Sequence, residues 1–163
     1  RVANAILKHE RSALADPNTT IARLNELISL MKKETVEGQR SIDHHIFVDR
    51  LMNIQARAFA MRCNDLRILS AAAANESLNL SQKVVKLQGT ALRHDLEGLA
   101  IDVMREFGLL YGNTPYLRDN GSWQRNYMFY LGLIIGGGTA QIQKNIIAER
   151  GLGLPREPQL SQG

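Results

Sequence analysis

The chain has 163 residues, 44% of them hydrophobic, which is sufficient for one domain with a sizeable buried core. Its 20 basic and 16 acidic residues are interleaved and give a formal net charge of +4, which favours anionic small ligands and argues against nucleic acid as a partner. Its single cysteine, Cys63, excludes an internal disulfide framework and a cysteine-based metal site, so we expect a cytoplasmic protein without a metal centre.

The first fifteen residues, 1–15, have a helical pattern that stops at Asp16-Pro17. The chain starts at Arg1 inside this pattern and not at Met, so we expect it to be part of a longer chain. No apolar run approaches the roughly 20 residues of a membrane-spanning helix, and we therefore expect no membrane span.

A second helix is expected from Thr19 or Thr20, either of which is a suitable N-cap. Apolar residues recur along it at helical spacing: Leu24, Leu27, Ile28 and Met31. Residues 34–40 are polar and predict a connection, in which Glu34 and Glu37 should be solvated.

Two long helices follow, over about 41–75 and 80–107, each with apolar residues at steps of three or four. The first pattern comprises Phe47, Leu51, Ile54, Ala58 and Met61, and the second comprises Leu92, Leu96, Leu99, Val103 and Phe107. Such patterns predict core-facing helix surfaces, with Glu97 at the edge of the second one.

Glycine and proline predict a loop over 108–121, and helices are expected over 122–135 and 139–150. We therefore predict an all-α, antiparallel up-and-down helical bundle without a sheet, formed by residues 1–150, followed by a C-terminal tail, 151–163.

The segment Gly136-Gly137-Gly138-Thr139 separates the last two expected helices. Glycine permits close approach of a ligand to the backbone, and Thr139 is a suitable N-cap. Because the first amides of a helix lack internal partners, Gly138–Gln141 could hold a phosphate or pyrophosphate. A simple break between two helices explains the same glycines.

The sequence GGGTAQIQKNIIAERGLGLPREP, residues 136–158, resembles the C-terminal signature of the acyl-CoA dehydrogenases. The resemblance extends more weakly through the rest of the chain and covers only that family's C-terminal helical domain. It implies FAD as the cofactor, with contacts from Gly138, Thr139 and Gln141. It also implies an acyl-CoA substrate, electron-transfer flavoprotein as the acceptor, and a homo- or hetero-oligomer built through the bundle.

The resemblance also implies α,β-dehydrogenation, in which a carboxylate removes the α-proton of the thioester. Many family members carry this base in the loop as Glu-Gly-Thr, but Gly137 stands there in this chain. Isovaleryl- and long-chain-type members instead carry it on an earlier helix before an arginine, as in Glu10-Arg11. Glu10 is therefore the candidate catalytic base, and the alternative is that it is an ordinary solvated charge.

Two segments depart from the family's pattern. Where the family has Arg-x-x-Phe-Gly facing a neighbour's FAD, this chain has Glu34 and Glu37 before Gly38, and a carboxylate repels a pyrophosphate. Where the family has Gln-x-x-Gly-Gly, only Gly108 of residues 105–109 matches. These departures indicate an unlike partner subunit.

Three hypotheses remain open. The chain is the C-terminal domain of an active acyl-CoA dehydrogenase, a non-catalytic partner or scaffold subunit of a heteromeric one, or an unrelated helical bundle. The combination of Glu10, Thr139 and Gln141 favours the first over the second, and the length of the C-terminal signature argues against the third.

Overall fold

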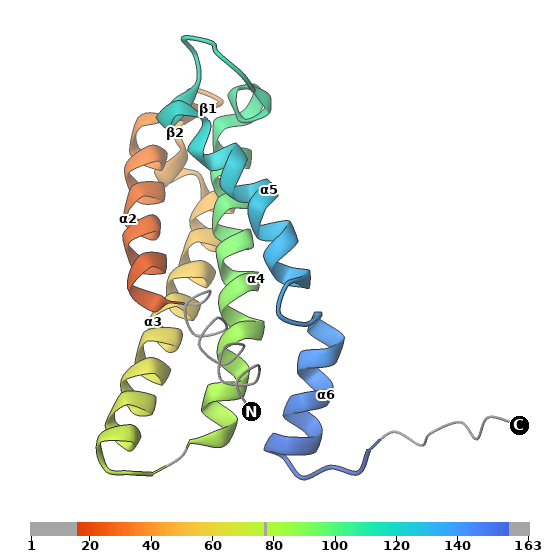
Figure 1. The fold of residues 1–163 in the computed structure, drawn as a ribbon. Helices are drawn as coiled ribbons and strands as arrows, with labels where there is room; N and C mark the ends of the chain where they lie inside the picture. Colours follow the sequence, from red (N-terminus) through yellow and green to blue (C-terminus); the bar gives the residue numbers. More distant parts are fainter. Residues whose placement is uncertain (1–15, 77, 157–163) are drawn as a thin grey trace, which may run out of the picture.

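The computed structural model describes residues 16–76 and 78–156, and this part of the chain is an all-α bundle with one very short strand pair. Four helices alternate in direction, and a fifth continues the direction of the fourth (Figure 1). They are α2 (Pro17–Lys33), α3 (His45–Ala73), α4 (Asn79–Met104), α5 (Ser122–Ile135) and α6 (Ala140–Gly151). The predicted up-and-down bundle is confirmed for these residues.

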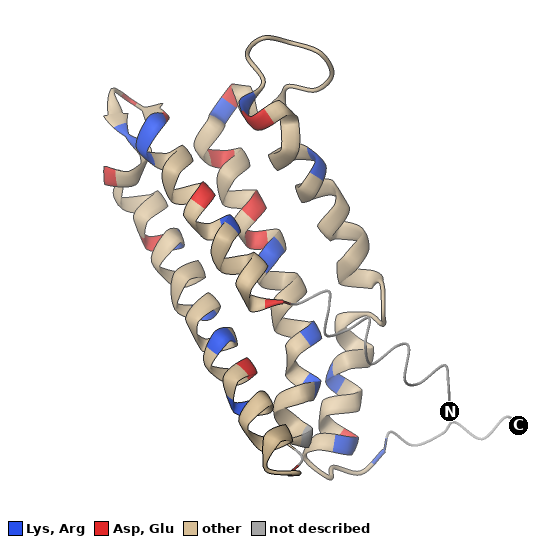
Figure 2. Ribbon diagram, turned by 60° about the vertical axis from the view of Figure 1, so that its left-hand side comes forward, with Lys and Arg blue, Asp and Glu red and all other residues tan. Residues whose placement is uncertain are grey.

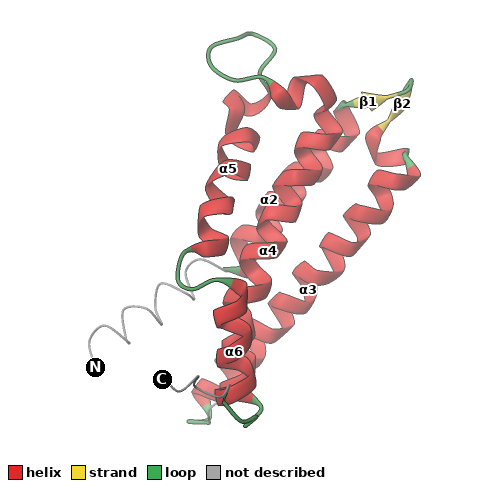
Figure 3. Cartoon of the chain, turned by 90° about the vertical axis from the view of Figure 1, so that its right-hand side faces the viewer, coloured by secondary structure: helices red, strands yellow, loops and turns green. Residues whose placement is uncertain are grey.

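A two-stranded antiparallel ladder connects α2 to α3, where we predicted no strand. It pairs β1 (Thr35–Val36) with β2 (Gln39–Arg40) at one end of the bundle (Figure 3). Glu37 and Gly38 between the strands both have positive φ, 53° and 79°. Two left-handed residues make the tight turn that joins antiparallel strands, so a polar connection with a glycine becomes a hairpin here.

The N-cap of α2 is Asp16, whereas we predicted Thr19 or Thr20. Its carboxylate accepts a hydrogen bond from the amide of Asn18 at 3.0 Å. Pro17 then occupies the first helical position, where its missing N–H costs nothing. Both threonine hydroxyls instead donate back to the carbonyl of Asp16.

The two long helices are shorter than predicted because 3-10 turns replace their ends. The turn η1 (Ser41–Asp43) precedes α3, and η2 (Arg105–Leu109) follows α4 at Arg105, whose φ is 55°. A third turn, η3 (Arg118–Gly121), leads into α5.

The core lies between α2, α3, α4 and the start of α5. The predicted apolar patterns are buried, apart from Ile28 and Phe107, which are partly buried. The buried members include Leu24, Leu27, Met31, Leu51, Ile54, Leu92, Leu96, Leu99 and Val103, joined by Trp123. Each such side chain contributes roughly 1.5–3 kcal/mol on burial, so these contacts dominate the stability of the bundle.

Glu97 corrects one expectation, because it is fully buried and does not lie at the edge of the apolar pattern. Elsewhere, acidic and basic residues are interspersed along the helices (Figure 2). Among the described helices, none is both long and apolar enough to cross a membrane.

Candidate functional site

The glycine segment is a tight, internally bonded loop between α5 and α6. The amide of Gly136 donates to the carbonyl of Gly132 at 2.8 Å, and that of Gly138 donates to Ile135 at 3.2 Å. Gly137 and Gly138 have φ values of 68° and 104°, which residues with a side chain rarely adopt. A Cβ added to Gly138 would lie only 2.8 Å from Nε2 of Gln143. Glycine at 138 therefore suits the conformation of the loop, and a side chain there would also displace Nε2 of Gln143.

Thr139 is the N-cap of α6, as the sequence predicted. Its Oγ1 accepts a hydrogen bond from the amide of Ile142 at 3.4 Å. The hydroxyl hydrogen remains able to donate to a ligand. The amides of Ala140 and Gln141, in the first turn, have no acceptor within the helix, and the helix dipole makes this end electropositive.

The three predicted contact residues thus meet at the start of one helix. Gly138 and Thr139 are partly buried, and Gln141 is exposed. Residues 136–143 contain no acidic side chain. The groups there that can donate to a ligand are a hydroxyl, an amide side chain and backbone N–H groups. This donor set fits an anionic cofactor with polar edges.

Two buried polar residues that sequence reasoning missed hold this loop: Lys86 and Gln143, both only 3% exposed. The ammonium of Lys86 on α4 donates to the carbonyls of Ile134, at 2.9 Å, and Gly138, at 2.6 Å. The amide nitrogen of Gln143 donates to the carbonyl of Gly137 at 2.8 Å. A sequence signal existed, because Lys86, Thr90, Arg93 and Glu97 follow one face of α4 at steps of four and three.

The candidate base, Glu10, lies outside the described residues, so the structure does not place it relative to the loop. Gly137, at the alternative position, has no carboxylate. Glu149, near the end of α6, pairs instead with Arg156 at 3.3 Å.

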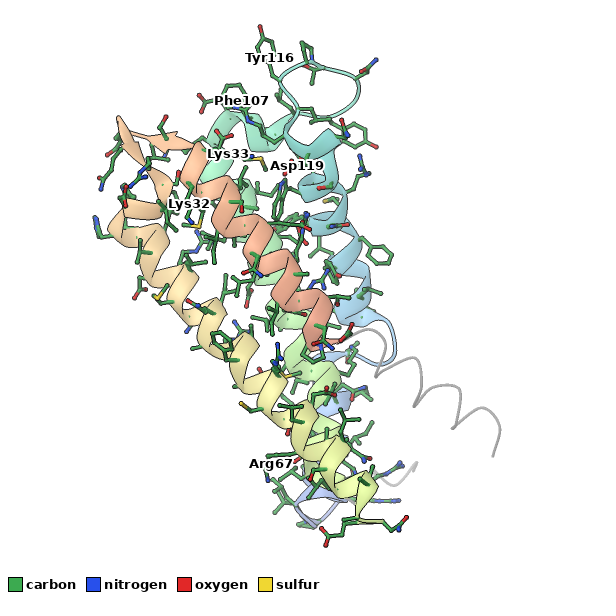
Figure 4. All side chains as sticks on the ribbon, turned by 90° about the vertical axis from the view of Figure 1, so that its left-hand side faces the viewer. Lys32, Lys33, Arg67, Phe107, Tyr116 and Asp119 are labelled. Carbon is green, nitrogen blue, oxygen red and sulfur yellow. The ribbon has the colours of Figure 1, made fainter. Side chains whose placement is uncertain are left out.

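The two segments that depart from the family's pattern meet at the end of the bundle that carries the hairpin. Glu34 and Arg105 line a cleft of about 1010 Å³ there, together with residues of α2, η2 and η3. Phe107, Asp119 and Lys33 mark this end (Figure 4).

Glu34 is held in this cleft by Arg118, which corrects the expectation that Glu34 is solvated. The Nε of Arg118 lies 2.5 Å from one carboxylate oxygen, and Nη2 lies 3.3 Å from the other. The Glu34 side chain is 13% exposed, whereas Glu37 is exposed as expected. The guanidinium also lies over the ring of Phe107, 4.5 Å from its centroid. The ion pair therefore connects the end of α2 to η3, the turn before α5.

Residues 1–152 match the family profile described as acyl-CoA dehydrogenase, C-terminal domain. Acyl-CoA dehydrogenase IpdE1 of Mycobacterium tuberculosis (strain ATCC 25618 / H37Rv) is 32% identical over 159 residues, covering 96% of this chain and 38% of that protein. Acyl-CoA dehydrogenase FadE26 of the same organism is 28% identical over 154 residues, covering 92% of this chain and 38% of that protein. The chain thus spans less than two fifths of the length of these relatives.

Solved structures share the fold. A chain of the ChsE4–ChsE5 complex from Mycobacterium tuberculosis superposes with a TM-score of 0.77 at 27% identity, covering 95% of this chain and 40% of that chain. A chain of the Tcur3481–Tcur3483 steroid ACAD superposes with a TM-score of 0.77 at 20% identity, covering 93% of this chain and 38% of that chain.

Proposed function

Because this chain belongs to the acyl-CoA dehydrogenase family, whose C-terminal domain it matches over residues 1–152, we propose that it is the C-terminal helical domain of an FAD-dependent acyl-CoA dehydrogenase. The observation that carries the proposal is the loop at 136–139, which ends in the Thr139 cap of α6. The reaction is α,β-dehydrogenation of an acyl-CoA thioester, with electron-transfer flavoprotein as the electron acceptor. The remainder of the active site lies on parts of the protein outside this chain.

Thr139, Gln141 and the backbone at Gly138 are the residues that hold FAD in this proposal. The Thr139 hydroxyl donates to the cofactor while its oxygen continues to cap α6 at the Ile142 amide. The positive end of the α6 dipole favours the negative charge of the cofactor's pyrophosphate. Bound FAD supplies the acceptor for the hydride that leaves the β-carbon.

Glu10 is the proposed catalytic base, by its resemblance to the Glu-Arg pair of isovaleryl- and long-chain-type members. A carboxylate can remove the weakly acidic α-proton when burial raises its pKa towards neutrality. The glycine at 137 supports this assignment, because the alternative position for the base has no side chain.

We propose that the functional assembly joins this chain to an unlike subunit. Glu34 lies in the cleft near η2 and is engaged by Arg118, so this end presents an ion pair where an anion-binding arginine is expected. The ChsE4–ChsE5 complex, named for two different chains, is one of the structures with this fold. An unlike partner also fits the alternative function, a non-catalytic partner or scaffold subunit of a heteromeric acyl-CoA dehydrogenase.

The flavin spectrum of the full-length protein, purified with its partner, tests the proposal. Thr139→Val keeps the shape of the side chain but removes the hydroxyl. We therefore expect less FAD per copy of this chain in the variant than in the wild type. Thr114→Val, in the loop before η3, is the matched control and should leave flavin content unchanged. Equal flavin content in the Thr139→Val variant and the wild type would contradict the assigned contact.

A further inference from the structure

The buried cation nearest the proposed flavin site belongs to α4 and lies about fifty residues before the loop in sequence. The ammonium of Lys86 donates hydrogen bonds to the carbonyl of Ile134, in the last turn of α5, and to that of Gly138, the residue before the Thr139 cap. One acceptor lies before the glycine segment and the other lies within it, so one side chain connects the end of α5 and the loop to α4.

We propose that Lys86 is a positioning residue for FAD, and this proposal rests on the function proposed above. Its ammonium fixes the path of residues 134–138 and so fixes the direction in which the Thr139 hydroxyl and the first amides of α6 point.

The carbonyls at this place need a hydrogen-bond donor, and a cation suits them. Ile134 belongs to the final turn of α5, whose carbonyls lack intrahelical donors and form the negative end of the helix dipole. Lys86 is only 3% exposed, so its ammonium supplies the donor to these carbonyls at a place with little access to solvent. An apolar side chain of the same length would leave buried acceptors unsatisfied, and the loop would have to rearrange to solvate them.

Gln143 is a second buried side chain that fixes the conformation of this loop. Its amide nitrogen donates to the carbonyl of Gly137, and it lies where a Cβ on Gly138 would clash. The Gly138 amide itself donates to Ile135. Between 134 and 138, four of the five carbonyls therefore accept hydrogen bonds from within the protein: Ile134, Ile135, Gly137 and Gly138. Such a loop is preorganised before the cofactor binds.

The test is FAD titration of the apo form of the full-length protein, in complex with its partner where it has one. We expect Lys86→Met to weaken FAD binding by about 10- to 100-fold, the effect of losing a buried hydrogen bond from a charged group. Lys144→Met is the matched control: it removes the same charge from an exposed position on α6 and should change affinity much less. Equal losses in the two variants would show a general charge effect and overturn the proposal.

A double-mutant cycle separates positioning from a purely structural role. If Lys86 acts by presenting Thr139, the losses in FAD affinity from Lys86→Met and Thr139→Val will be non-additive. Strictly additive losses would overturn the proposal. Lys86→Met is unusable if circular dichroism of the apo form shows that it does not fold. Gln143→Leu then replaces it in the same cycle and tests whether the loop positions Thr139, because it releases the Gly137 carbonyl of the same loop.

The two proposals fail differently in this experiment. An unchanged FAD affinity in Thr139→Val contradicts the flavin contact and with it the proposed site. A loss in Thr139→Val together with wild-type affinity in Lys86→Met contradicts only the role of Lys86.

Discussion

Arg23 of α2 and Glu97 of α4 form a buried ion pair with two parallel hydrogen bonds, although they are separated by 74 residues in sequence. The Nε of Arg23 lies 2.9 Å from Oε1 of Glu97, and Nη2 lies 2.8 Å from Oε2. The guanidinium also stacks over Trp123 at the start of α5, 3.4 Å from the ring centroid. One side chain thus connects three helices of the bundle.

Removing Arg23 should destabilise the domain strongly. Arg23→Met leaves the Glu97 carboxylate fully buried without its cation, for which a loss of about 3–5 kcal/mol is typical. The measurement is hydrogen exchange of the α2 and α4 amides in the full-length protein. The double variant Arg23→Met/Glu97→Leu removes both charges and should recover most of the loss. A double variant as unstable as the single one would contradict this explanation.

The Arg23→Met defect should depend on pH. Burial raises the pKa of Glu97 even in the intact protein, where hydrogen bonds from Arg23 oppose the shift. Without Arg23 the pKa of Glu97 in the folded state rises further above its unfolded value, so the folded state holds the proton more tightly. The contribution of Glu97 to the stability of the variant is then greatest below the ordinary carboxyl range and falls as pH rises through the folded-state pKa.

Thermal midpoints measured from about pH 4.5 to pH 8 should show this trend. The deficit of Arg23→Met relative to the wild type should widen with increasing pH. The double variant with Glu97→Leu lacks the titrating group, so its stability should not show the fall with rising pH that Glu97 causes in Arg23→Met. A deficit of Arg23→Met that stays constant across this range would contradict a buried, titrating Glu97.

Replacing the glycine at 138 should destabilise the domain and weaken FAD binding, whereas replacing a nearby helical glycine should not. Gly138→Ala forces a side chain onto a backbone with φ of 104° and brings its Cβ to 2.8 Å from Gln143. We expect a cost of about 1–3 kcal/mol together with weaker FAD binding. Gly132→Ala is the matched control, because a Cβ there has open space and alanine favours a helix by roughly 0.5–1 kcal/mol. Thermal midpoints and FAD titration of both variants check the contrast.

The proposed unlike partner can be tested by counting flavins. The full-length protein purified alone should hold less than one FAD per chain, and co-expression with its partner should give a hetero-oligomer with fewer flavins than chains. Mass measurement of the intact assembly together with the flavin absorbance gives this ratio. A homo-oligomer with one FAD in every chain would contradict the unlike partner.

The helices could be predicted from the sequence because apolar residues at steps of three and four report directly on a buried helix face. The Thr139 cap was predictable for a similar reason, since capping depends on neighbours within four residues. The burial of Glu97 and the role of Lys86 were not, because each depends on an interaction with a distant segment: Arg23 for one, the loop carbonyls for the other. Polar residues spaced along α4 show which face is involved but not which partner they meet.

The local errors have a different origin, because their signals lie within a few residues. Glu37 and Gly38 form the two-residue turn between strands whose paired residues are close in sequence, Thr35 with Arg40 and Val36 with Gln39. Asp16 caps α2 because Pro17 fits the first helical position, a rule that the sequence contained but that two nearby threonines obscured.

Glu10 gives the most direct prediction about catalysis. Gly137 cannot remove a proton, so dehydrogenation requires a carboxylate from elsewhere. Among the other candidates, Glu34 and Glu97 are engaged by Arg118 and Arg23, and Glu149 pairs with Arg156 near the far end of α6. A carboxylate that already forms an ion pair with a guanidinium is not free to reach the α-carbon of a substrate, and Glu97 is in addition fully buried.

Glu10→Gln in the full-length enzyme should therefore keep FAD and acyl-CoA binding but lose turnover by about 10²–10⁴-fold, the range typical of a lost general base. Flavin reduction by substrate under anaerobic single-turnover conditions measures this step separately from binding. Gly137→Glu in that background should restore only a small part of the rate, because φ is 68° at 137 and a side chain there is strained. Normal flavin reduction in Glu10→Gln would show that the base lies elsewhere, and a carboxylate supplied by the partner subunit would then support the scaffold function.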